Sequence, residues 1–148
     1  MTVSLFAYGT LRDPEVRRLV LGRDIPADQI SEATAAGQRV VFFPGRTYPA
    51  LRPEAGATAT GTLLVGLTPT DLERLDRFEG PEYARGPVDL IVSGAALAAD
   101  VYWPALPIPA AAADWRLADW QARYKKAFLA REAGDIDRFR ANLSAVPR

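Results

Sequence analysis

The first residue that could do chemistry is Glu79, a carboxylate at a position where the local pattern requires an apolar side chain. Residues 68–80 have the spacing of a short amphipathic helix, with Leu72 and Leu75 on its buried face. Glu79 follows them by seven and four residues and directly precedes Gly80, which can end the helix. Burial and the negative end of the helix dipole both disfavour a charged carboxylate. We therefore expect a raised pKa and a group able to act as a general base.

A structural role for Glu79 is the competing interpretation. Helix ends fray, and the side chain then turns outward or forms an ion pair with Arg74, Arg77 or Arg85. The two interpretations differ in what surrounds the carboxylate: a cavity favours chemistry, and an arginine favours a structural role.

A second candidate is the loop that follows the first predicted strand, residues 3–8. Tyr8-Gly9-Thr10-Leu11 ends this strand and leads into a helix that begins at Asp13-Pro14. Such a loop presents several backbone N–H groups at one place and can bind a carboxylate or a developing oxyanion. It lacks the spaced glycines and the Lys-Ser/Thr ending of a phosphate-binding loop. The alternative is that Gly9 simply permits a turn.

Two absent residue types narrow the chemistry. The chain has no Cys and no His, which excludes disulfides, thiol nucleophiles, the usual base of serine and cysteine hydrolases and the commonest transition-metal ligand. Acid–base chemistry near neutral pH must use a carboxylate, a Lys or a Tyr with a shifted pKa. Carboxylate binding of Mg²⁺ or Ca²⁺ stays open, but no segment has the spacing of a calcium loop, and we expect no metal and no cofactor.

Length and composition indicate an ordinary globular protein. With 148 residues, 49% of them hydrophobic, we expect one domain spanning residues 1–148. Eighteen basic and eighteen acidic residues cancel to a formal charge of zero, which argues against a nucleic-acid partner. No apolar stretch is long enough to cross a membrane and no signal peptide is recognisable, so we expect a cytoplasmic protein without membrane contact. Its oligomeric state is left open.

The predicted elements form an α+β domain. Helices are expected from Asp13-Pro14 to about Leu21, from Thr68-Pro69, and from Asp114 onward. A hairpin turn begins at Ser93-Gly94. The expected strands and extended segments cover residues 3–8, 38–43, 48–51, 58–67, 88–92 and 97–103. These five to six mostly antiparallel strands predict a small mixed β-barrel at about residues 3–103 with flanking helices, followed by a helical segment at about 114–143.

One face of the last helical segment is predicted to consist of Leu117, Trp120, Tyr124, Ala127 and Phe128. The helix with its three aromatic residues, Trp115, Trp120 and Tyr124, either closes a pocket or caps the barrel, and we expect the second. A final turn or two is expected from Asp135 to Leu143.

Taken together, three motifs give the chain a resemblance to the gamma-glutamylcyclotransferase-like family, in particular its branch of gamma-glutamylamine cyclotransferases and plant AIG2-like proteins. The motifs are Leu5-Phe6-Ala7-Tyr8-Gly9-Thr10-Leu11-Arg12, Tyr48-Pro49-Ala50-Leu51 and Leu75-Asp76-Arg77-Phe78-Glu79-Gly80-Pro81-Glu82-Tyr83-Ala84-Arg85. Gly61 and the Val101-Tyr102 strand fit the same order, so the resemblance covers roughly residues 3–103.

The resemblance implies a barrel with an active-site cavity and a reaction in which the α-amine of a small gamma-glutamyl substrate attacks its own amide. The products of that reaction are 5-oxoproline and a free amine. Glu79 matches the general acid/base of the family, and Tyr83 matches an aromatic residue near the cavity. Arg85 matches a recurring position without an assigned role. The pocket for the glutamyl group matches Tyr8, Gly9, Thr10 and Leu11.

Two other functions compete with this one. A binding or regulatory module would keep the barrel and the cavity without turnover, and a carboxylate-based hydrolase would use water to cleave another amide or ester. Product analysis separates the hydrolase from the cyclotransferase, because hydrolysis yields glutamate and cyclisation yields 5-oxoproline. The leaving amine is not specified by the sequence; the segments expected to contact it are Pro44–Tyr48 and Pro104–Ala113.

Overall fold

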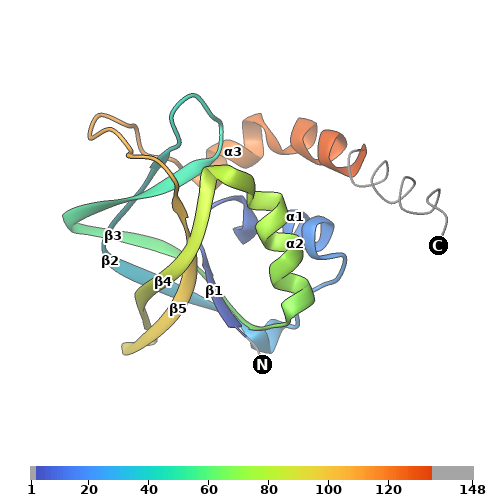
Figure 1. Cartoon of the computed structure of the whole chain (residues 1–148), viewed down its shortest axis with the longest axis horizontal. Coiled ribbons are helices and arrows are strands. Elements are labelled where there is room, and N and C mark those ends of the chain that lie inside the picture. The colour runs from blue at the N-terminus through green and yellow to red at the C-terminus, as the bar shows by residue number, and fades with distance from the viewer. Residues whose placement is uncertain (1–2, 135–148) are drawn as a thin grey trace.

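The computed structural model, which describes residues 3–134, contains a closed barrel of five strands in the order β1-β3-β2-β4-β5 (Figure 1). All neighbouring pairs are antiparallel except β1 and β5, which are parallel. The strands are β1 (Val3–Ala7), β2 (Ile30–Phe42), β3 (Pro49–Leu67), β4 (Tyr83–Val92) and β5 (Ala95–Pro104). The prediction of a mixed, largely antiparallel barrel is confirmed.

Three α-helices accompany the barrel. They are α1 (Pro14–Leu21), α2 (Pro69–Glu79) and α3 (Leu117–Arg123), with 3-10 turns at η1 (Thr10–Arg12), η2 (Ala27–Gln29) and η3 (Gly80–Glu82). α1 and α2 lie side by side against the barrel (Figure 1), and the Arg23 guanidinium after α1 forms an ion pair of 2.7 Å with Asp71 of α2. Among residues 3–134 no helix is both long enough and apolar enough to span a bilayer.

Two strands are much longer than predicted. β2 begins at Ile30 rather than at residue 38, and the predicted segments 48–51 and 58–67 are parts of the single strand β3. Residues 30–36 mix apolar and polar side chains without a sustained alternating pattern, yet each pairs with a residue of β3. Gly37, with a φ of 75°, allows the register shift after which pairing resumes at Gln38. Backbone pairing between distant segments, rather than side-chain alternation, sets the length of these strands.

The predicted hairpin turn is present. Ser93 and Gly94 both have positive φ, 50° and 80°, as the two central residues of a tight hairpin turn require, and they join β4 to β5 with Val92 paired to Ala95. β4 begins at Tyr83 rather than at residue 88, and β5 covers Ala95–Pro104 rather than 97–103, because the antiparallel ladder continues from the turn to the pair of Tyr83 and Pro104.

Gly61 allows β1 and β3 to approach each other closely. A Cβ atom at this position would lie 2.5 Å from the backbone oxygen of Ala7 and 2.6 Å from the ring of Phe6. Both distances are shorter than any relaxed contact, so a side chain cannot be accommodated without moving β1. Because β1 leads directly into the loop at Gly9, Gly61 helps to position that loop.

The C-terminal segment differs in detail from its prediction. α3 ends at Arg123, and residues 125–134 form a further helical stretch. The helix is interrupted at Tyr124. The Tyr124 side chain is exposed, whereas Trp120 is buried and Phe128 is half-buried. The prediction that Tyr124 shares one helix face with Trp120 and Phe128 is wrong. The turns expected at 135–143 lie outside the described residues.

Candidate active site

α2 places Glu79 as the helical pattern predicts. Thr68 caps the helix: its hydroxyl accepts from the Asp71 amide at 3.2 Å, and the Asp71 carboxylate accepts from the Thr68 amide at 2.9 Å. Leu75 is fully buried, and Gly80, with a φ of 69°, ends the helix. Glu79 is therefore the last helical residue, on the buried side of the helix.

The Glu79 side chain is half-buried and lines a cavity of about 410 Å³. Its carboxylate has no hydrogen bond and no ion pair to any of residues 3–134. Two of the arginines that the structural interpretation required are engaged elsewhere: Arg74 donates to the backbone oxygen of Leu21, and Arg85 binds Asp76 and Asp100. The surroundings of Glu79 thus correspond to the chemical interpretation rather than to the structural one.

Burial, followed by the negative charge of Asp76, raises the pKa of Glu79 from 4.5 to about 8. Asp76 lies one helical turn before Glu79. Burial opposes the ionisation of Asp76, but hydrogen bonds from Arg85 and Tyr102 outweigh it and lower the pKa of Asp76. Asp76 thus stays charged near Glu79. The burial of Glu79 was predicted from the sequence, whereas the effect of Asp76 was not, although a spacing of three residues on a helix indicates such a contact.

Three tyrosines of the cavity wall have fixed hydroxyl groups. Tyr8 donates to the backbone oxygen of Tyr102 at 2.6 Å, Tyr83 donates to the backbone oxygen of Pro49 at 2.5 Å, and Tyr102 donates to the Asp76 carboxylate at 2.6 Å. Burial is the main cause that raises the pKa of each phenol well above its ordinary value. All three therefore remain neutral at physiological pH.

The loop after β1 folds into the η1 turn beside Glu79 in the same cavity. The backbone hydrogen bonds that close it are donated by Arg12 to Gly9 at 3.1 Å and by Asp13 to Thr10 at 3.0 Å. The amides of Thr10 and Leu11 come before Arg12 and Asp13 in the chain and lie at the N-terminal end of the turn, where backbone N–H groups have no partner within the turn. A Cβ atom at Gly9 would lie 2.8 Å from Pro49 Cγ, so glycine lets the loop pack against the Tyr48–Leu51 motif.

All six residues that the sequence analysis proposed for the site line this one cavity: Tyr8, Gly9, Thr10, Leu11, Glu79 and Tyr83. Arg85 does not line it. Its guanidinium lies 3.0 Å from carboxylate oxygens of Asp76 and of Asp100, so it acts on the site through Asp76. Polar and aromatic wall residues to which no role in the site was assigned from the sequence include Phe78, Glu82, Tyr102, Trp120, Phe128, Arg131 and Glu132.

One of the two segments expected to contact a leaving group does line the cavity. Arg46 and Tyr48 face it together with Glu82: Arg46 Nε lies 2.9 Å from the Tyr48 hydroxyl and 3.2 Å from the Glu82 carboxylate, and Tyr48 also donates to Glu82. Residues 104–113 do not line this cavity, so the prediction is wrong for that segment. Pro109 instead borders a more open neighbouring hollow. Within residues 3–134 no cluster of acidic side chains is arranged to hold a metal ion.

The barrel and its cavity define a fold class that solved structures share. A solution structure of an Arabidopsis thaliana protein matches with a TM-score of 0.67 and 26% identity, covering 99% of this chain and 95% of that one. A structure titled gamma-glutamyl cyclotransferase matches with a TM-score of 0.58 and 16% identity, covering 70% of this chain and 67% of that one. The second likeness shows a common fold.

Sequence comparison gives the family. The sequence model described as "Gamma-glutamyl cyclotransferase, AIG2-like" matches residues 5–122, and the chain belongs to this family. AIG2-like protein A of Arabidopsis thaliana is 31% identical over 129 residues, which is 85% of this chain and 76% of that protein. AIG2-like protein C of the same plant is 32% identical over 128 residues, which is 84% of this chain and 73% of that protein.

Proposed function

We propose that this protein is a cyclotransferase that cleaves a γ-glutamyl amide and releases 5-oxoproline and a free amine. The observation that carries the proposal is the Glu79 carboxylate, which lines a cavity, has no cationic partner among residues 3–134 and has its pKa raised to about 8. A carboxylate in this state exchanges protons near neutral pH, as a general acid/base must. Family membership supports the same class of reaction.

In this reaction the α-amine nitrogen of the substrate attacks the carbon of its own γ-carbonyl group. A new C–N bond closes the five-membered ring, and Glu79 accepts the proton that the nitrogen loses. The bond to the departing amine then breaks as Glu79 returns this proton to it. Nucleophile and amide belong to one molecule, so proximity replaces a protein nucleophile, and no water is consumed.

The η1 loop supplies the binding groups in this proposal. The amides of Thr10 and Leu11 at the start of the turn hold either the substrate's α-carboxylate or the oxyanion that forms on the γ-carbonyl. Tyr8 and Tyr83 form the sides of the glutamyl pocket. Their hydroxyl groups already donate to backbone oxygens, so they shape the pocket while Glu79 moves the proton.

The test is release of 5-oxoproline, measured by mass spectrometry, from γ-glutamyl-ε-lysine, γ-glutamyl dipeptides and γ-glutamyl polyamines. We expect turnover of at least one class and a fall of about 10²–10⁴-fold in Glu79→Gln. The matched control is Glu73→Gln on the exposed side of the same helix, which should keep full activity.

Three results would contradict the proposal. Glutamate as the product would indicate hydrolysis. Tight binding of every substrate without conversion would indicate a binding module. Appreciable activity of a folded Glu79→Gln protein would remove Glu79 from the mechanism.

A further inference from the structure

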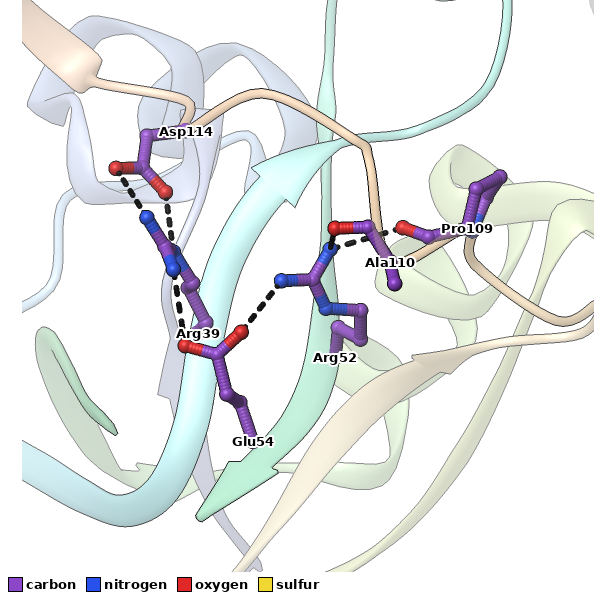
Figure 2. Close-up of polar contacts among 6 residues, drawn as sticks. All are labelled: Arg39, Arg52, Glu54, Pro109, Ala110 and Asp114. Carbon is purple, nitrogen blue, oxygen red and sulfur yellow. Dashed lines mark hydrogen bonds and ion pairs between the residues drawn. The ribbon is translucent and has the colours of Figure 1, made fainter. Parts of the chain in front are cut away.

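The chain after β5 is fastened to the outside of the barrel by a group of side chains that we call the clamp: Arg39, Arg52, Glu54 and Asp114 (Figure 2). Arg52, which is 9% exposed, donates to the backbone oxygens of Pro109 and Ala110 at 2.8 and 2.9 Å. Arg39 binds the Asp114 carboxylate at 2.5 Å, and Glu54 accepts from both arginines.

Backbone pairing extends this attachment up to the start of α3. The Phe42 amide donates to the oxygen of Ala113 at 2.9 Å, and the Trp115 amide donates to the oxygen of Val40 at 3.1 Å. The Trp115 indole N–H also donates to the backbone oxygen of Thr47 at 2.8 Å, beside the cavity residue Tyr48. The chain directly before α3 is thereby fixed relative to β2.

A second attachment joins the helical segment to the η1 loop. The Asp13 carboxylate is 1% exposed and caps α1, immediately after the Thr10–Arg12 turn. It accepts from Gln121 Nε2 at 2.8 Å and from Lys125 Nζ at 2.8 Å. Removing such partners from a buried carboxylate strongly destabilises the folded protein. The bonds to Asp13 therefore hold the helical segment against the proposed substrate loop.

These two attachments bring an aromatic surface to the cavity. The ring of Phe128 packs edge-on against Phe78 and Trp120, with centroid distances of 6.0 and 5.3 Å. Phe78 directly precedes Glu79, and all three rings line the same cavity as Glu79. We call these three side chains the aromatic wall. The expectation that the helical segment only caps the barrel is therefore wrong.

Phe128 lies beyond the part of the chain that the family model covers, which ends at residue 122. The residues proposed to bind the glutamyl group and to move the proton, at positions 8–11 and at Glu79, lie inside it. In the proposed reaction only the glutamyl half of the substrate forms the ring, so the departing amine can differ without changing which bonds form and break. A wall residue that belongs neither to the η1 loop nor to the acid/base is thus placed to act on the departing half.

We propose that Phe128 is a specificity-determining residue whose ring contacts the departing amine and favours an apolar group on it. This inference rests on the proposed cyclotransferase function. Because the glutamyl half occupies the η1 loop, the rest of the cavity, with the aromatic wall, is left for the other half of the substrate. An apolar group on the amine leaves water when it packs against the wall, whereas a small amine gains nothing there.

The experiment compares γ-glutamyl benzylamide with γ-glutamyl methylamide. In the parent protein kcat/KM should favour the benzylamide. Phe128→Ala should lower kcat/KM for the benzylamide about tenfold and leave the methylamide within about twofold, and Phe128→Leu should restore part of the preference. Tyr124→Ala is the matched control, because Tyr124 is an exposed aromatic residue of the same segment that does not line the cavity. It should change neither value.

The same preference is also measured as a ratio of binding affinities. Each amide is titrated into the Glu79→Gln protein, with and without the change at Phe128, and binding is followed by Trp fluorescence, independently of turnover. A benzylamide-to-methylamide affinity ratio that Phe128→Ala and Phe128→Leu leave unchanged would overturn the inference, and so would an equal loss for both amides. Absence of Glu79-dependent 5-oxoproline from both amides would instead refute the proposed function, and the affinity ratio would still decide the role of Phe128.

Discussion

Replacing Glu79 by Gln should make the protein more stable, by an amount that grows with pH. The folded protein binds the Glu79 proton more tightly than the unfolded chain does, because its pKa rises from 4.5 to about 8 on folding. The stability that this group contributes is fully present below about pH 4.5 and is lost as the pH rises through the folded value. The side chain in Glu79→Gln cannot ionise, so this variant does not lose stability in this way as the pH rises.

The size of the effect follows from the two pKa values. Each pKa unit corresponds to about 1.4 kcal/mol, so the free energy of unfolding of Glu79→Gln should rise relative to the parent by about 3 kcal/mol between pH 4 and pH 7. Asp13, Asp71 and Asp76 have lowered pKa values, which makes both proteins lose stability in acid. Asp13 and Asp71 lie apart from Glu79 and contribute equally to the free energy of unfolding of both proteins. Their contribution therefore cancels when the two free energies are subtracted.

Urea unfolding at several pH values between 4 and 8, followed by the fluorescence of the three tryptophans, measures this difference. The m-value should be the same in both proteins. A difference that does not change with pH would mean that Glu79 titrates normally in the fold. A difference that changes in the opposite direction would mean that Glu79 is ion-paired, and either result would refute the reasoning.

Three further changes have expected outcomes. Gly61→Ala should lower the free energy of unfolding by about 1–3 kcal/mol in a urea titration, because the new Cβ would lie 2.6 Å from the Phe6 ring; parent-like stability would contradict this. Asp76→Asn should lower the pKa of Glu79 by removing a neighbouring negative charge, so the acid limb of the pH–kcat/KM profile should move to lower pH. Arg52→Met should cost about 1–3 kcal/mol, measured by thermal unfolding, since two backbone oxygens lose their donor.

Much of the candidate site was readable from short stretches of sequence. The helix that carries Glu79 was predicted from its cap at Thr68, its apolar spacing and its end at Gly80, all within thirteen residues. The turn at Ser93-Gly94 was predicted in the same way. Long strands were predicted poorly, because residues 30–36 have no sustained alternation and are held by pairing with β3.

The sequence by itself determined the chemical repertoire and the local geometry of this protein. It has no His and no Cys, and a carboxylate occupies an apolar helical position. Periodicity and capping act between residues at most a few positions apart, so a sequence displays them directly.

Only the tertiary structure decided what surrounds that carboxylate. The cavity exists because the fold brings Glu79, the loop at Gly9 and Phe128 together around one space. The bond between Gln121 and Asp13 joins residues 108 positions apart. Contacts of this length depend on how the whole chain packs, and no local pattern encodes them.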